Sequence, residues 1–564
     1  MRWPLCRCPR GARQPGGGFM TFDPDDAQRQ VIEATDPVLL VLGGAGTGKT
    51  TTAAAAVRRG LEQCDQETLG RSRRTSRALF LSFSRAAVSQ TLDRSADVLG
   101  PYQDRVQTTT YHAFAWDLIQ RFGNVVGLPA PELTSAAEAR LFTTRSKILY
   151  KDLLPLALRI CRVPAVAAHL QTRWSVIVCD EFQDTDRNQF QLLTTIRGSA
   201  RLMLLGDLNQ CIYRKLPGVV GVGPERVADA LALEGARQID LSPVSHRDPT
   251  GVLPAAAEAV RLRDFSHEAV STAIRDERLR IVADLPPDDE ADLVASHVQQ
   301  LLDEGHTSVA VFSHHIDSTT ELSDQLRDLG IDHEIIGLPE SLTAALHAQY
   351  SMIAFAAGIS PWERVRRHLA VFVTSSIRGN SAPPLAYQIL QATPGLLGRR
   401  LASLHDRLSE ASLQDAPLLA AQAHRGIGLP RGHRHWDRAA QLLRPLVAQS
   451  LRRGPDYATA LKFLEQAVSE RGASLLTYEA DGAETPVQLM GLYQAKGREA
   501  DATVVVLRNS DFFGTEPPPY LDGSRLLYVV LTRARRTTVV LLFGTPPPLV
   551  APLQRLSNRE GDTP

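Results

Sequence analysis

Residues 38–51 read VLLVLGGAGTGKTT, and residues 43–50 within them fit the pattern G-x-x-x-x-G-K-[ST]. The apolar run 38–42 is short and bounded by Pro37 and Gly43, which predicts a buried parallel strand, and residues 50–59 predict the helix that follows. Free backbone N–H groups and the positive end of the dipole attract an anion to the start of such a helix. The stretch therefore predicts an α/β fold that binds a nucleoside triphosphate at this turn.

The pattern also predicts a role for individual residues of the loop. Glycines let the backbone approach the phosphates, Lys49 is expected to reach the β- and γ-phosphate oxygens, and Thr50 is expected to bind Mg²⁺. ATP and Mg²⁺ are accordingly the expected cofactors. The expected nucleotide-binding residues here are Gly43, Gly44, Ala45, Gly46, Thr47, Gly48, Lys49, Thr50 and Thr51.

Carboxylates follow a second apolar run, VIVC at 176–179. If this run is a strand of the same parallel sheet, its carboxyl end lies beside the phosphate loop. We expect Asp180 to hold Mg²⁺, and Glu181 to orient and deprotonate the attacking water. A third run, 202–205, leads to Gln210, whose amide is expected to contact the γ-phosphate.

Composition limits how this protein could bind nucleic acid, metal or membrane. The 564 residues carry 62 basic and 62 acidic side chains, so any basic surface for nucleic acid would have to be local. The six cysteines include no C-x-x-C pair, which favours free thiols over disulfides or zinc. No apolar run reaches the roughly 18 residues of a membrane span, and the start of the chain lacks an apolar signal core. We therefore expect a cytoplasmic protein without membrane contact.

Eight short segments add to the phosphate loop, at 22–28, 81–87, 110–114, 180–184, 206–213, 245–247, 494–499 and 526–535. Among them are DEFQD at 180–184, AKGRE at 495–499 and LTRAR at 531–535. In sequence and order they resemble the motifs of the UvrD/Rep-type superfamily 1 helicases, and the resemblance covers most of residues 21–545. It implies an ATP-dependent DNA helicase with 3′-to-5′ polarity.

The resemblance assigns further residues. Arg247 and Arg533 would stabilise the transfer of the γ-phosphate, because cations beside its oxygens stabilise the negative charge of the transition state. They complete a catalytic set of Lys49, Asp180, Glu181, Gln210, Arg247 and Arg533. Further nucleotide contacts would be Gln28, which reads adenine in the family, and His246, Gly497 and Glu499. The implied DNA contacts are Phe83, Ser84, Arg85, Tyr111, His112 and Lys215.

Three positions depart from the family pattern. Lys215 stands where an aromatic residue commonly stacks on a base, His246 replaces a tyrosine that stacks on adenine, and Tyr493 replaces a histidine. One stacked base is worth roughly 1–3 kcal/mol, so the grip on a single strand is expected to be weaker or to shift toward phosphate contacts. No nuclease pattern D-x-E-x-K follows the last motif.

The spacing of apolar runs predicts two RecA-like P-loop NTPase cores, each a parallel sheet flanked by helices and each interrupted by a mostly helical insert. Expected strands lie at 38–42, 78–83, 176–179, 202–205 and 239–242, and at 280–283, 308–312, 502–507 and 537–543. The first core is assigned to residues 20–114 and 173–250, with the insert 115–172 between them. The second core is assigned to residues 251–339 and 473–548, with the insert 340–472 between them. Residues 1–19 are expected to be a disordered tail or a start ahead of the true Met20, and 549–564 a tail.

Within the second insert, residues 425–428 read RGIG and resemble a glycine motif that binds duplex phosphates; a plain loop between two helices explains them equally well. The neighbouring Arg431, His433, Arg434, His435 and Trp436 are interpreted as a basic and aromatic patch that could sit on a phosphate backbone. Two alternate histidines are too few for a zinc site.

These observations predict an ATP-dependent DNA helicase or translocase, in DNA repair or recombination, that binds single strands and single/double-strand junctions. Repair-protein partners are not indicated by the sequence. Two alternatives stay open: a DNA-stimulated ATPase that strips proteins without unwinding, and a nucleotide-switched protein-interaction module.

Overall fold

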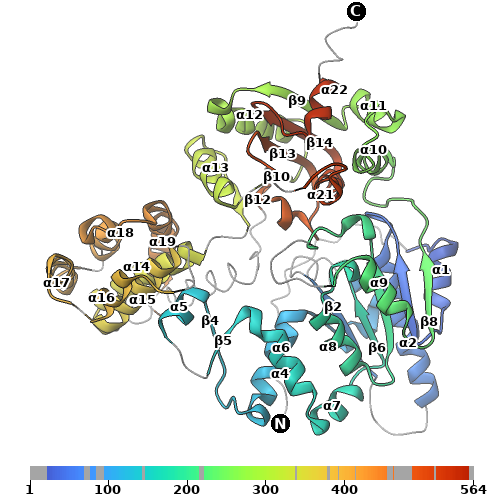
Figure 1. The fold of residues 1–564 in the computed structure, drawn as a ribbon, viewed down its shortest axis with the longest axis horizontal. Helices are drawn as coiled ribbons and strands as arrows, with labels where there is room; N and C mark the ends of the chain where they lie inside the picture. Colours follow the sequence, from blue (N-terminus) through green and yellow to red (C-terminus); the bar gives the residue numbers. More distant parts are fainter. Residues whose placement is uncertain are drawn as a thin grey trace, which may run out of the picture.

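The computed structural model contains two α/β cores and a helical region (Figure 1). It describes residues 22–68, 76–83, 95–142, 146–214, 221–314, 316–336, 340–377, 381–391, 393–412, 414–453, 462, 485–512 and 516–557. In Figure 1 the two cores lie one above the other on the right, and the helical region projects to the left. Within these ranges no single helix is long and apolar enough to cross a membrane.

Six parallel strands form the first sheet, in the order β3-β2-β6-β7-β1-β8. They are β1 (Val38–Leu42), β2 (Ala78–Ser82), β3 (Val106–Thr110), β6 (Val176–Cys179), β7 (Arg201–Gly206) and β8 (Ala236–Asp240). Each paired strand runs in the same direction, so the segments that follow β1, β6 and β7 meet at one edge of the sheet. This places the phosphate loop, the two adjacent acids and the Gln210 segment side by side.

The apolar run at 38–42 forms β1 because both faces of this strand are covered. Val38 and Leu40 pack into the cluster on one face, and Leu39 and Val41 pack into the cluster on the other. A strand buried on both faces needs apolar side chains at successive positions. The covering helices are α1 (Asp26–Glu33) and α2 (Lys49–Thr68) on one face, and α4 (Tyr111–Phe122), α6 (Leu153–Cys161), α8 (Arg187–Arg197) and α9 (Pro224–Leu231) on the other.

The two edge strands of this sheet differ from the sequence expectation. β8 begins at Ala236 and ends at Asp240, earlier than the expected 239–242, and β3 was not expected. Both strands are only partly buried, with the sequences ARQID and VQTTT. An edge strand keeps polar side chains, and a search for apolar runs therefore misplaces or misses it.

The segment between β3 and β6 is mostly helical, as the sequence indicates. Its exception is a parallel pair of short strands, β4 (Glu132–Thr134) and β5 (Lys147–Leu149), beside α5 (Ala136–Leu141). Helices α6 and α7 (Pro164–Gln171) pack into the cluster that covers the first sheet. This insert thus shares a hydrophobic core with the sheet.

The second sheet also has six parallel strands, in the order β11-β12-β10-β13-β14-β9. They are β9 (Leu279–Leu285), β10 (Val309–Ser313), β11 (Glu334–Ile335), β12 (Val487–Gly491), β13 (Ala500–Arg508) and β14 (Ala534–Phe543). Its helices are α10 (Val252–Arg261), α11 (Glu268–Arg275), α12 (Glu290–Asp303), α13 (Ile316–Asp328), α21 (Leu521–Leu531) and α22 (Ala551–Ser557). Two parallel sheets flanked by helices confirm the expected fold class of two RecA-like cores.

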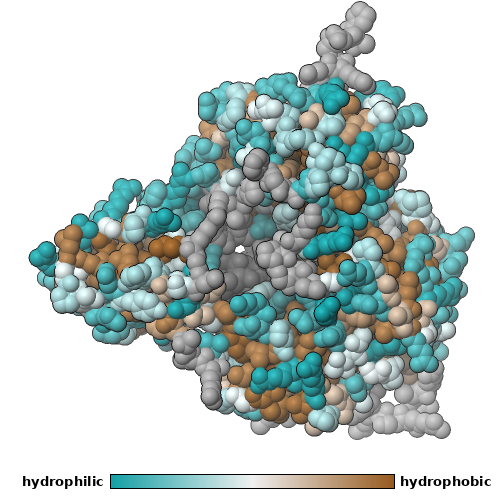
Figure 2. Space-filling model, viewed as in Figure 1, coloured by the Kyte–Doolittle hydropathy of each residue, from teal (hydrophilic) through white to brown (hydrophobic). Residues whose placement is uncertain are grey.

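The helical region interrupts the second core between β11 and β12. It consists of α14 (Glu340–Ala356), α15 (Trp362–Ser375), α16 (Pro384–Gln391), α17 (Leu396–Ser409), α18 (Ala416–Ile427) and α19 (His433–Arg453), which share one hydrophobic cluster. Figure 2 shows brown, hydrophobic side chains over this region on the left of the view. Exposed apolar residues here include Ile359, Tyr387, Leu396 and Leu418.

The structure corrects the expectation of a surface aromatic at Trp436. This side chain is fully buried in the helical region, its ring lies 4.8 Å from that of Phe372, and its indole N–H donates to the Ala420 carbonyl at 3.0 Å. Trp436 therefore belongs to the core and cannot contact a phosphate backbone. Residues 425–427 form the end of α18, and Gly428, with φ of 75°, terminates this helix. This conformation agrees with the second interpretation of residues 425–428, a plain connection between two helices.

Replacing Trp436 by alanine should destabilise the helical region. Loss of a fully buried aromatic side chain typically costs about 3–5 kcal/mol because the cavity closes only in part. Limited proteolysis and urea unfolding followed by circular dichroism would measure the loss, with His433→Ala, an exposed neighbour on α19, as the control. Equal unfolding midpoints for the two variants would contradict the buried role.

Candidate functional site

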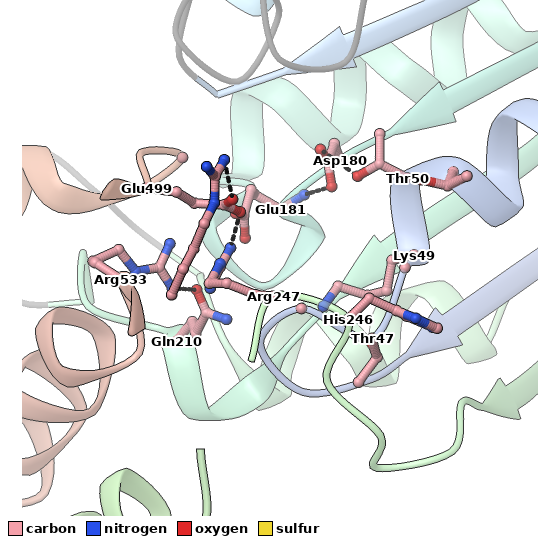
Figure 3. Close-up of a pocket in the computed structure, with 15 residues that line it drawn as sticks. Thr47, Lys49, Thr50, Asp180, Glu181, Gln210, His246, Arg247, Glu499 and Arg533 are labelled. Carbon is pink, nitrogen blue, oxygen red and sulfur yellow. Dashed lines mark hydrogen bonds and ion pairs between the residues drawn. The ribbon is translucent and has the colours of Figure 1, made fainter. Parts of the chain in front are cut away.

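A cavity of about 340 Å³ lies where the two cores face each other (Figure 3). The first core contributes the phosphate loop, the acids after β6, Gln210 and the segment after β8, and the second core contributes the remainder. Its lining residues are Gly46, Thr47, Gly48, Lys49, Thr50, Thr51, Asp180, Glu181, Gln210, His246, Arg247, Gly497, Glu499, Arg533 and Arg535. All six expected catalytic residues therefore line one cavity.

The phosphate loop requires glycine at two positions. Gly46 and Gly48 have φ of 77° and 81°, a backbone region that side chains disfavour. A Cβ on Gly46 would lie 2.4 Å from Ser245 Oγ, and a Cβ on Gly48 would lie 3.0 Å from Gln28 Nε2. The residues that surround the loop thus leave no room for a side chain, and backbone N–H groups can face an anion.

Lys49 is the first residue of α2, and its ammonium group is held by its own loop. The Nζ atom donates to the carbonyl of Gly43 at 2.7 Å and to that of Gly44 at 2.9 Å. Gly43, Gly44 and Ala45, which the sequence pattern also predicts to bind the nucleotide, are not among the residues that line the cavity. To reach a phosphate, the lysine must exchange carbonyl partners for phosphate oxygens, which are stronger acceptors for a cation.

Thr50 and Asp180 fit the requirements of a magnesium site. The Thr50 hydroxyl lies 3.4 Å from Asp180 Oδ2, so two oxygen ligands converge beside the loop. Mg²⁺ prefers oxygen ligands and commonly takes one or two from the protein and the rest from phosphates and water. Burial and the neighbouring Glu181 carboxylate raise the pKa of Asp180 to about 6, so a cation here would relieve an unfavourable buried charge.

Glu181 is held in an unusual backbone conformation that aims its side chain into the cavity (Figure 3). Its φ and ψ are 54° and 42°, in the left-handed region that non-glycine residues seldom adopt. Gln183 Nε2 donates to Glu181 Oε2 at 2.7 Å and fixes the carboxylate. Burial acts to raise the pKa of Glu181, but the ammonium groups of Lys496 and Lys49 outweigh it and lower the pKa to about 2, which keeps the group ionised as a general base must be.

Both expected arginines are anchored across the gap between the cores. Arg247 pairs with Glu499 at 2.5 Å and donates to the Thr532 carbonyl at 2.8 Å. Arg533 donates to Gln210 Oε1 at 3.0 Å, and burial together with the positive charge of Arg247 lowers its pKa to about 10. Each arginine therefore already joins one core to the other.

Sequence reasoning left out two residues here: Arg535, which lines the cavity, and Lys496, which pairs with the acids beside it. Lys496 has the larger effect on the charge of the site. It comes from the second core, is buried, and its Nζ pairs with Asp184 of the first core and lies 3.4 Å from Glu181 Oε2. Burial lowers the pKa of Lys496 to about 8 even though the Glu181 carboxylate acts in the opposite direction. The lysine is visible in the AKGRE motif, but its partner is more than 300 residues away in sequence, and no local pattern links them.

Two expected base contacts occupy different positions. His246 lines the cavity, whereas Gln28 is 1% exposed and lies behind the phosphate loop. The Gln28 amide donates to the Thr47 carbonyl at 3.2 Å. Gly497, Glu499 and Thr51 line the cavity as expected.

The expected DNA contacts are only partly brought together. Phe83 stacks on Tyr213 with ring centroids 5.0 Å apart, and His112 stacks on Tyr150 at 4.2 Å. Ser84, Arg85 and Lys215 lie outside the described residues.

The structure corrects the expected DNA contact at Tyr111. This residue is 1% exposed and packs in the core beneath the first sheet, and its hydroxyl lies 2.8 Å from Cys179 Sγ. As the first residue of α4, Tyr111 turns its ring toward the core, and no surface of the ring is left for a nucleic acid.

Residues 28–215 match the family model of an AAA domain. That family consists of P-loop NTPases typical of superfamily 1 helicase-like proteins, and P-loop NTPases generally use ATP and Mg²⁺. The matched stretch runs from Gln28 through the phosphate loop and the two acids, and it ends beyond Gln210. A search of the curated proteins finds no match.

Asp180 should make stability depend on pH. Its pKa is raised from 3.8 to about 6 on folding, so its ionisation costs stability above pH 6, and the cost disappears as the pH falls through 6 toward 4. Asp180→Asn should therefore stabilise the nucleotide-free protein by about 3 kcal/mol at pH 8 and by about half as much at pH 5. Thermal unfolding at both pH values measures the gain, with the exposed Asp26→Asn as control; an equal gain at both would contradict the assignment.

Lys496→Met should destabilise the contact between the cores by about 3–5 kcal/mol, because it leaves the buried Asp184 carboxylate without its cation. Adding Asp184→Asn should recover part of that loss, because the unpaired charge is then gone. Urea unfolding of the two single variants and the double variant measures this coupling. A loss of stability in the double variant equal to the sum of the two single losses would show that the Lys496–Asp184 pair does not stabilise the protein.

Proposed function

We propose that this protein is an ATP-dependent DNA helicase or translocase of the UvrD/Rep type. The observation that carries the proposal is a single cavity, lined by a phosphate loop from one core and by Arg533, Glu499 and Gly497 from the other. Nucleotide bound there touches both cores, and its hydrolysis removes a contact that both share. Such a change can move one core relative to the other and so do mechanical work.

The proposed DNA strand runs over the same edge of the first sheet. Phe83 follows β2, and Tyr213 follows the Gln210 segment, so their stacked rings lie beside the cavity. The Tyr213 hydroxyl donates to the Tyr493 carbonyl of the second core at 2.9 Å. Aromatic rings at such a place support base stacking, which tolerates any sequence.

Single-stranded DNA and single/double-strand junctions are the proposed partners, with DNA repair or recombination as the setting. The 3′-to-5′ polarity rests on the motif resemblance alone. Unwinding of duplexes with a 3′ tail, but not with a 5′ tail, would support it. ATP hydrolysis stimulated by single strands without unwinding would instead favour a translocase that strips proteins, and hydrolysis indifferent to DNA would favour an interaction module.

Four substitutions test the catalytic roles. Lys49→Ala should abolish turnover by removing a phosphate contact, whereas Glu181→Gln should bind MgATP and not hydrolyse it, because the base is lost. Arg533→Ala should keep ATP affinity within about tenfold and lower kcat by on the order of 10³, since it acts on the transition state, and Arg247→Ala should behave alike.

Steady-state hydrolysis with oligothymidylate and equilibrium binding of a fluorescent nucleotide supply the two measurements. The exposed neighbour Arg536→Ala is the control. Near-normal hydrolysis by Glu181→Gln would remove that carboxylate from the mechanism, and an Arg533→Ala variant that lost affinity but kept its rate would reverse the role given to this arginine.

A further inference from the structure

We infer that the Tyr111 hydroxyl is a positioning group for Glu181, because it holds one end of the loop that carries this carboxylate. The inference rests on the proposed hydrolysis of ATP, in which Glu181 acts as the general base. It adds to that reaction a residue that is buried in the first core and lies outside the cavity.

The loop that carries Glu181 is a tight turn whose two ends lie beside each other. Cys179 is the last residue of β6, and Thr185 follows the 3-10 turn η4 (Phe182–Asp184). Cys179 Sγ and Thr185 Oγ1 lie 3.5 Å apart, and the Thr185 backbone N–H donates to the Phe182 carbonyl at 3.0 Å. The place of the Glu181 carboxylate therefore depends on how these two ends are held.

Tyr111 reaches this junction from the first turn of α4. Its hydroxyl lies 2.8 Å from Cys179 Sγ, so the phenol, the thiol and the Thr185 hydroxyl form one chain of polar contacts. All three side chains are buried. Burial raises the pKa of Cys179 to about 12, so the thiol stays protonated and can donate to one partner while it accepts from the other.

These contacts belong to the core of the first domain and not to the nucleotide cavity. Tyr111 packs in the hydrophobic cluster beneath the first sheet, and neither Tyr111 nor Cys179 lines the cavity. The Thr110 hydroxyl accepts from the Ala113 backbone N–H at 3.1 Å and so fixes the start of α4. A triphosphate in the cavity replaces none of these partners.

The hydroxyl, and not the ring, is what the core does not require. Phe114, three positions along the same helix, fills the same cluster without a polar group. A buried tyrosine hydroxyl needs a partner, and its partner here is the residue that directly precedes Asp180. Glu181 has left-handed φ and ψ of 54° and 42°, and such a conformation persists only where the surroundings fix it. Loss of the hydroxyl should let the loop relax and move the carboxylate.

Tyr111→Phe, which keeps the ring, should lower kcat for ATP roughly fivefold to tenfold and leave KM within about twofold, because the base is misplaced while the phosphate loop is unchanged. Cys179→Ala should lower kcat to a similar extent. The double variant should lose no more than the larger single loss, since both changes remove one contact. Tyr350→Phe is the matched control: it removes the hydroxyl of another buried tyrosine, in the helical region, and should leave kcat unchanged.

The experiment measures kcat and KM with oligothymidylate present, at a temperature well below the melting temperature of every variant, and Cys179→Ala carries the same test if Tyr111→Phe does not fold. A lower kcat with unchanged KM, absent from Tyr350→Phe, supports the inference. A kcat of Tyr111→Phe within about twofold of wild type would overturn it, as would losses that multiply in the double variant. If the wild-type protein hydrolyses no ATP, the proposed function fails and the inference fails with it; if wild type and Tyr111→Phe hydrolyse ATP equally, the proposed function stands and only the inference is lost.

Discussion

The arrangement of the two cores depends on buried charges that are balanced across the gap between them. Asp184 and Glu181 of the first core face Lys496 of the second, and Arg247 of the first core pairs with Glu499 of the second. Removing one partner from such a pair leaves a charge without compensation in a medium that cannot solvate it. The cores are therefore held at the spacing at which these groups form their ion pairs. A bound triphosphate would add its own negative charge to this group of buried charges.

The parallel sheets explain why the site forms at this edge. Each strand of the first sheet delivers its following loop to the same side, so Lys49, Asp180 and Gln210 converge although they lie far apart in sequence. Local backbone conformation then aims the groups. Gly46 and Gly48 open the phosphate loop, and the left-handed Glu181 directs its carboxylate into the cavity, which is the kind of strain that functional sites retain.

The helical region is attached to both cores, which bears on any movement between them. Arg140 of α5 donates to the Thr374 carbonyl at 3.0 Å, and Arg367 pairs with Glu138 at 2.6 Å. On the other side, Arg438 of α19 lies 3.6 Å from Asp324 of α13. If the cores move as the nucleotide is hydrolysed, the helical region must move with one of them and give up contacts with the other.

The sequence alone determined the phosphate loop, the strand that precedes it, the acids after 176–179 and the class of fold, because each of these depends on neighbouring residues or on a short apolar run. Tertiary structure decided what depends on distant partners. Edge strands β3 and β8 are polar because only one side is paired, Trp436 and Tyr111 are buried because helices from elsewhere cover them, and Lys496 gains its role from Asp184 in the other core. Burial and charge pairing arise between segments that the fold brings together, and no local pattern encodes them.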